Sequence, residues 1–168
     1  MATRRSPLSY SSSSSSGQGY EIFLNFSSIY TRNTFTNHLY NALDVAGIHT
    51  FMDDVQLRTG EEIGPDLLSA IQQSRISVPI FSKNYVSSKW CLNELVEIVE
   101  CKKTMNQHVL PIFYHVDPAE VRHYTGIYAE ALHKHNKRVD QGIIDEWKNA
   151  LTEAGGLKGW DLKNIDGG

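Results

Sequence analysis

The residues with the clearest chemical potential are Trp90 and Glu94, which stand four positions apart in a segment with helical periodicity. Side chains at this spacing lie on one face of a helix. Arg32 follows the first apolar run, and in a parallel sheet it would face them across a crevice. Such a ring, carboxylate and guanidinium can stack a heteroaromatic ring, hold ribose hydroxyls and stabilise a cationic sugar transition state. The alternative, which the spacing alone favours, is that Glu94 is solvated on a helix face and Trp90 covers the core.

Three other patterns resemble functional motifs but lack the required context. Asp53 and Asp54 form an acidic pair, yet they follow the second apolar run rather than the first, so we interpret them as a turn. His133, His135 and His123 could suggest a metal site. However, His133 and His135 are two positions apart on a predicted helix, so their side chains point to different sides, and we predict no metal site there. The sequence contains neither a P-loop nor a Gly-x-Ser-x-Gly elbow.

Composition favours a single soluble domain. The 168 residues suffice for one domain of ordinary size, and no apolar run approaches the roughly 18 residues of a membrane span. The net charge of -3 argues against an electrostatic nucleic-acid binder. Cys91 and Cys101 lie about 15 Å apart along one predicted helix, beyond the roughly 7 Å limit for a disulfide. We therefore expect free thiols and a reducing compartment.

Residues 1–19 are expected to form a disordered tail. They include the run from Ser11 to Ser16 and offer hardly any apolar side chain to bury. The start also contains arginine and no acid, which suits an organelle transit peptide, and that alternative stays open. The single domain is then assigned to residues 20–168.

Five short apolar runs predict strands, and segments with helical spacing lie between them, which is the pattern of an α/β fold. Pro79 and Pro111 each fall inside a predicted strand, where proline removes a hydrogen-bond donor, but we retain both strands. The predicted strands are residues 20–26, 49–52, 76–81, 109–114 and 157–162.

Helical spacing predicts the segments between the strands. Phe35, Leu39 and Leu43 share one face of a first helix, which should end at Gly47. Pro65 begins a second helix, and Ser87 or Ser88 caps a third, whose inward stripe is Cys91, Leu95, Ile98 and Val99. After Asp117-Pro118 we expect a long irregular connection. Two further helical segments, 128–138 and 144–154, precede the last strand.

Sequential βα units with right-handed crossovers give either a flavodoxin-like fold or half of a Rossmann fold. Five strands favour the former, a three-layer sandwich whose parallel strands have the order 2-1-3-4-5. Ligands bind such folds at the point where the order reverses, outside the carboxyl ends of strands 1 and 3. Residues 27–32 and 82–90 would line that crevice, with Glu94 one turn inside the following helix.

Seven stretches of the chain, in this order, resemble the plant TIR domain (Toll and interleukin receptor homology) of intracellular immune receptors. The resemblance extends from Tyr20 to about Leu162, and it implies the same five-stranded flavodoxin-like fold. The stretches read YEIFLNF, TRNTFTNHLYNAL, GIHTFMDD, LRTGEEIGPDLLSAIQQSRISV, FSKNYVSSKWCLNELVEIVECK, VLPIFYHVDPAEVRHYTGIYAEAL and LKGW.

The resemblance implies an activity. Many members of this family cleave NAD+ at the nicotinamide–ribose bond with the glutamate of a Trp-Cys-Leu-x-Glu-Leu segment, which here is Glu94. NAD+ would be the substrate, with no separate cofactor and no metal. The implied substrate-binding residues are Arg32, Trp90, Ser27 and Phe26, and the implied mobile loop spans 54–63 with Leu57, Arg58 and Gly60.

The resemblance also implies partners. Family members associate through the first helix, where a Ser-His pair is usual and this chain has Asn37-His38. A second contact surface surrounds the glycine that here is Gly126. The domain would then be a cytoplasmic signalling module of plant innate immunity, with a nuclear location as an alternative. Self-association with other TIR domains would activate its NAD+ hydrolase activity.

The chain departs from the family pattern in two ways that argue against NAD+ hydrolase activity. Where the family usually reads Phe-Arg-Gly-Glu-Asp-Thr-Arg, residues 26–32 read Phe-Ser-Ser-Ile-Tyr-Thr-Arg. A lost arginine contact to a pyrophosphate would cost about 1 to 3 kcal/mol, or roughly 10 to 100-fold in affinity. The chain also ends at Gly168, where the family continues into a final helix, so we expect that helix to be absent. The alternative function is a non-catalytic module that recruits other TIR domains.

Overall fold

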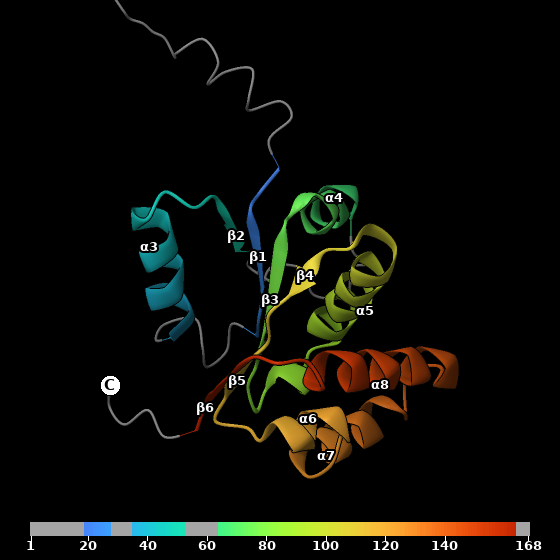
Figure 1. The fold of residues 1–168 in the computed structure, drawn as a ribbon. Helices are drawn as coiled ribbons and strands as arrows, with labels where there is room; N and C mark the ends of the chain where they lie inside the picture. Colours follow the sequence, from blue (N-terminus) through green and yellow to red (C-terminus); the bar gives the residue numbers. More distant parts are fainter. Residues whose placement is uncertain (1–18, 28–34, 53–63, 164–168) are drawn as a thin grey trace, which may run out of the picture.

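A parallel β-sheet forms the centre of the molecule, with helices on both faces (Figure 1). The computed structural model describes residues 19–27, 35–52 and 64–163. Of the predicted tail, residues 1–18 lie outside these ranges. Within these ranges the strand order is β2-β1-β3-β5-β6, with β4 paired to β3, which confirms the predicted topology. The strands are β1 (Ile22–Asn25), β2 (Thr50–Met52), β3 (Ile76–Phe81), β4 (His108–Val109), β5 (Ile112–Tyr114) and β6 (Trp160–Leu162).

The fourth predicted strand, residues 109–114, is divided into the two short strands β4 and β5. β3 pairs with β4 through residues 76–77 and with β5 through residues 80–81. The same register, continued across the interval between them, puts Pro79 opposite Pro111. Because neither proline has an N–H group to donate, the interruption falls where the ladder lacks donors.

Helix α3 (Asn37–Val45) lies on one face of the sheet, whereas α4 (Pro65–Gln73) and α5 (Lys89–Met105) lie on the other (Figure 1). β1 shows why both faces are covered, because successive side chains of a strand point to opposite sides. Leu24 belongs to an apolar cluster with Leu39 of α3. Phe23 belongs to a different cluster with Leu67 of α4 and Ile98 of α5. Position 25, two residues after Phe23, therefore faces α5.

The remaining helices extend the layer that contains α5. They pack around a third apolar cluster with Leu95 of α5, Trp147 and Leu151. None of the helices in the described ranges has the length and hydropathy needed to cross a membrane. These elements are the 3-10 helix η3 (Tyr85–Ser87), α6 (Pro118–Arg122), α7 (Ile127–His135) and α8 (Gln141–Gly155).

Helix ends follow the capping residues that the sequence contains. Gly47, just after α3, has a positive φ of 83°, which is readily available only to glycine. The Ser88 side chain accepts a 3.1 Å hydrogen bond from the backbone nitrogen of Cys91, so Ser88 rather than Ser87 caps α5. Cys91 and Cys101 are both buried, and neither forms a disulfide, as predicted.

The connection after β5 is not irregular throughout, and that prediction is wrong. Asp117 accepts a 3.0 Å hydrogen bond from the backbone nitrogen of Ala119, and Pro118 occupies the first turn of α6. An acidic N-cap followed by proline is a helix-start signal. With only five residues, α6 is too short to show a helical period in the sequence.

Candidate functional site

The predicted site lies at the carboxyl ends of β1 and β3, the adjacent strands at which the sheet order reverses. β1 ends at Asn25 and continues into Phe26 and Ser27, which are both buried. β3 leads through the buried Ser82 into η3 and then α5. Ligands of open α/β sheets bind outside the strands at such a reversal. These segments therefore form the framework of the candidate site.

Glu94 is buried within this framework, with 1% of its surface exposed. Its Oε1 accepts a 2.8 Å hydrogen bond from Nδ2 of Asn25. The interpretation of Glu94 as a solvated residue on an outer helix face is therefore wrong. Helical geometry explains the difference, because position 94 follows Cys91 by three residues and precedes Ile98 by four, and so shares the buried stripe of α5.

Asn25 belongs to the site, although no sequence motif singled it out. Its side chain is fully buried, and Nδ2 also lies 3.3 Å from the carbonyl oxygen of Cys91. Its Oδ1 accepts a hydrogen bond from the hydroxyl of Tyr85. One signal was present in the sequence: Asn25 is a polar residue within an apolar strand, two positions after the core residue Phe23. A buried amide at such a position needs partners, and these partners build the site.

Tyr85 remains protonated at neutral pH. Burial raises its pKa well above the usual value, and the nearby Cys91, Tyr128 and Glu94 act in the same direction, whereas the hydrogen bond to Asn25 lowers it. The hydroxyl is thus available as a donor to Asn25. Tyr128, whose pKa is also raised mainly by burial, donates a 2.8 Å hydrogen bond to the backbone oxygen of Ser82.

The other predicted site residues fall into two groups. Trp90 is buried in the same apolar cluster as Phe23 and Ile71, so the interpretation that it covers the core is confirmed. Its contact with substrate stays a prediction, as do those of Phe26 and Ser27. Several further predicted residues lie outside the described ranges: Arg32, Asp53, Asp54, Leu57, Arg58 and Gly60.

The predicted association residues occupy two separate places in the fold. His38 is exposed and Asn37 half-buried in the first turn of α3. Gly126 precedes α7 with φ 59° and ψ -128°, and an added Cβ would lie 2.4 Å from Oε2 of Glu120. The same oxygen accepts a 3.0 Å hydrogen bond from the backbone nitrogen of Ile127. Gly126 therefore has a role in the turn between α6 and α7, independent of any association.

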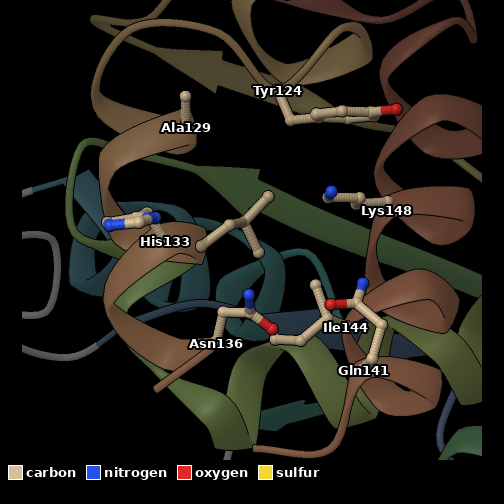
Figure 2. A pocket seen from close by; sticks show the side chains of 8 residues that line it. Tyr124, Ala129, His133, Asn136, Gln141, Ile144 and Lys148 are labelled. Carbon is tan, nitrogen blue, oxygen red and sulfur yellow. The ribbon is translucent and has the colours of Figure 1, made fainter.

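A pocket of about 180 Å³ lies between α7 and α8, and Glu94 is not among its lining residues (Figure 2). Leu132 and Ile144 contribute apolar surface to it, while His133 and Lys148 are polar lining residues. The Lys148 Nζ lies 5.3 Å from the centre of the Tyr124 ring, a cation–π contact. The pocket contains none of the predicted catalytic or substrate-binding residues. The described residues also hold no group of three or more metal-ligating side chains.

Fold and site together define a flavodoxin-like α/β domain with a buried carboxylate at the switch point of its sheet. The family profile of the TIR domain matches residues 19–167. The chain therefore belongs to the TIR domain family, which confirms the resemblance seen in its motifs.

The relatives of the chain are plant disease resistance proteins. It is 51% identical over 143 residues to disease resistance protein RPV1 of Vitis rotundifolia, an overlap of 85% of this chain and 10% of that protein. It is 47% identical over 151 residues to TMV resistance protein N of Nicotiana glutinosa, an overlap of 89% and 13%. The chain thus spans about a tenth of the length of these relatives.

Among solved structures, the chain is similar to the TIR domains in the structure of the activated Roq1 resistosome directly recognizing the pathogen effector XopQ. The TM-score is 0.78 at 45% sequence identity, and the match covers 89% of this chain and 92% of that one. The parallel sheet flanked by helices is therefore the fold of a plant TIR domain.

Proposed function

We propose that this domain is an NAD+ nucleosidase in which Glu94 is the catalytic carboxylate. The observation that carries the proposal is the burial of Glu94 at the sheet reversal, with its Oε1 held by Asn25. A carboxylate acts more strongly on a nearby charge in a site of low dielectric than in water. TIR family membership and the position of Glu94 in the Trp-Cys-Leu-x-Glu-Leu segment support the same assignment.

The proposed reaction breaks the bond between the nicotinamide nitrogen and C1′ of the ribose. Nicotinamide leaves with the bonding electron pair, and positive charge develops on C1′ and the ring oxygen. The negative charge of Glu94 stabilises this oxocarbenium-like state. A water molecule then adds to C1′ and releases a proton to solvent, so that the products are nicotinamide, ADP-ribose and a proton.

Nucleotide affinity is expected to be modest. Ser27, which is buried just after β1, stands where the family usually has arginine. A serine cannot supply the charge-assisted contact to a pyrophosphate that arginine does, and the loss corresponds to about 10 to 100-fold in affinity. Phe26 and Trp90, together with Arg32, are proposed to contact the rest of the nucleotide.

The biological role that we propose is signalling in plant innate immunity within the cytoplasm, following association with other TIR domains. The relatives are named as disease resistance proteins, and the similar solved structure shows TIR domains within a resistosome. Helix α3 has no fully buried residue, so it offers a surface for another copy. Association through α3 and the Gly126 region would concentrate the catalytic sites.

The test is release of nicotinamide from NAD+ by concentrated protein, measured by chromatography at several NAD+ concentrations. We expect release by the wild type and a loss of at least about 100-fold in Glu94→Gln, which keeps the side-chain volume but removes the charge. Glu100→Gln is the matched control, because Glu100 is an exposed residue of the same helix. It should match the wild type.

Two results would contradict the proposal. Nicotinamide release by Glu94→Gln at the wild-type rate would remove Glu94 from the catalytic role. No release by the wild type at concentrations where it self-associates would leave the non-catalytic module that recruits other TIR domains as the function.

A further inference from the structure

Three elements of the fold place one polar side chain each in the same buried position. Asn25 comes from the end of β1, Tyr85 from η3 and Glu94 from α5. Asn25 and Tyr85 are 0% exposed and Glu94 is 1% exposed. The hydroxyl of Tyr85 donates to Oδ1 of Asn25, and Nδ2 of Asn25 donates to Oε1 of Glu94 at 2.8 Å. We call this set the Tyr85–Asn25–Glu94 chain.

Donor and acceptor types fix the direction of this chain. An asparagine amide has a donor end and an acceptor end, and rotation by half a turn exchanges them. Because Tyr85 keeps its proton, its hydroxyl supplies a donor, which the oxygen of the Asn25 amide accepts. The amide nitrogen then faces Glu94 and the carbonyl oxygen of Cys91, which are both acceptors. With the amide reversed, its oxygen would face these two acceptors, and the Tyr85 hydroxyl, which also lies 3.3 Å from the carbonyl oxygen of Cys91, would no longer donate to Asn25.

A fixed donor matters for a flexible carboxylate. A glutamate side chain has several rotatable bonds, and its oxygens act on a transition state only when they are held in place beforehand. The short hydrogen bond from Asn25 fixes Oε1 from the β1 side, while the backbone of α5 fixes the other end of the side chain. The N–H group also favours the ionised carboxylate over its neutral form.

We propose that Asn25 is a positioning residue for Glu94 and that Tyr85 acts through Asn25 by fixing the orientation of its amide, an inference that rests on the proposed NAD+ nucleosidase function. Neither residue touches the reacting atoms in this scheme. Both determine how well the Glu94 carboxylate is aimed and how readily it ionises.

Tyr85→Phe and Tyr128→Phe form a matched pair of variants for the test. Each removes one hydroxyl from a fully buried tyrosine of the same apolar cluster. The Tyr85 hydroxyl donates to Asn25 and also lies 3.3 Å from the carbonyl oxygen of Cys91, whereas that of Tyr128 donates to the backbone oxygen of Ser82. We expect Tyr85→Phe to lower kcat for nicotinamide release about tenfold with little change in KM, because one orienting hydrogen bond is lost. Tyr128→Phe should keep the wild-type kcat, even where the two variants lose similar stability.

Asn25→Leu supplies a second readout, since it keeps the branching and the number of side-chain heavy atoms but removes both polar ends of the amide. We expect a loss of about 100-fold in kcat. The acidic limb of the pH–kcat profile should also move to higher pH, because the ionised carboxylate loses a donor. A purely structural role for Asn25 would lower the amount of folded protein without moving that limb.

The outcomes separate this inference from the proposed function. If the wild type releases nicotinamide and Glu94→Gln does not, but Tyr85→Phe matches Tyr128→Phe in kcat, the positioning role is overturned and the catalytic role of Glu94 stands. An unmoved acidic limb in Asn25→Leu has the same meaning. If Asn25→Leu fails to fold, the comparison of the two tyrosine variants decides. A wild type that releases no nicotinamide overturns the proposed function and, with it, this inference.

Discussion

At the scale of single residues, the burial of Glu94 is costly and therefore informative. Removal of a carboxylate from water costs several kcal/mol, and its partners offset that cost only in part. An aliphatic side chain at this position would continue the stripe of Cys91, Leu95 and Ile98 without the cost. Stability alone thus does not explain a glutamate at position 94. Buried ionisable groups at ligand-binding edges of a sheet are typical of functional sites, and this supports the proposed role.

His135 is a half-buried ionisable residue, and it bears on stability. Its Nε2 lies 2.9 Å from the backbone oxygen of Val86, and its ring packs edge-on against Trp147. Burial lowers its pKa, the hydrogen bond to Val86 acts in the opposite direction, and Lys89 lowers the pKa further. The unfolded chain therefore binds a proton at higher pH than the folded one does. This contribution to stability is present above about pH 6.5 and is lost as the pH falls through the lower folded pKa.

We accordingly expect the free energy of unfolding of the wild type to fall between about pH 7 and pH 5 more steeply than that of His135→Gln. Glutamine keeps an N–H donor for the Val86 oxygen but does not titrate. Urea denaturation at several pH values measures the slopes. His133→Gln, at an exposed position of the same helix, is the control and should keep the wild-type slope. An equally steep slope in His135→Gln would show that another group accounts for the pH dependence.

At the scale of elements, the sequence predicts most of the fold because long amphipathic segments carry a strong period. The helices at Pro65 and after Ser88 begin where their capping residues predict, and residues 76–81 form a strand as expected. Short elements carry too little pattern, which is why α6 was missed. The topology of the sheet predicts that Glu94 lies at the crevice. It does not predict the contact of Glu94 with Asn25, because that contact depends on how α5 packs against β1.

Gly126 provides an element-scale prediction, because it shapes the turn from α6 into α7. Its backbone conformation is one that side-chain-bearing residues rarely adopt, and an added Cβ would meet Oε2 of Glu120 at 2.4 Å. We expect Gly126→Ala to lower the free energy of unfolding by about 1 to 3 kcal/mol. Thermal and urea denaturation measure this effect.

Gly142→Ala is the control for that prediction. Gly142 lies in the first turn of α8, where alanine favours the helix. An added Cβ there would lie 3.1 Å from Oδ2 of Asp140, an exposed side chain that can shift, so the loss of stability should be smaller than in Gly126→Ala. If Gly126→Ala keeps wild-type stability, the turn does not require glycine, and any defect of that variant in association would then be a direct surface effect.

At the scale of the whole molecule, the two faces of the sheet are covered unequally. Among the described helices, α3 alone packs on the face that carries Leu24, while α4 through α8 lie on the other side (Figure 1). No residue of α3 is fully buried, and Val45 at its end is 87% exposed. A helix with this much exposed surface has room for a partner on its outer side. This arrangement agrees with the proposed association through α3.

The last prediction is that the double variant Asn37→Ala, His38→Ala weakens self-association. Both residues lie in the first turn of α3, where their side chains can reach a neighbouring copy without contributing to a buried core. Sedimentation velocity should show a lower apparent mass than for the wild type at the same concentration. The rate of nicotinamide release per molecule should no longer rise with protein concentration.

The matched control is Asn136→Ala, His133→Ala, which removes the same two residue types from exposed positions at the end of α7. Since those residues lie on the opposite side of the sheet from α3, this control should sediment and react like the wild type. If both double variants sediment and react like the wild type, association does not depend on Asn37 and His38, and the region around Gly126 becomes the surface to test next.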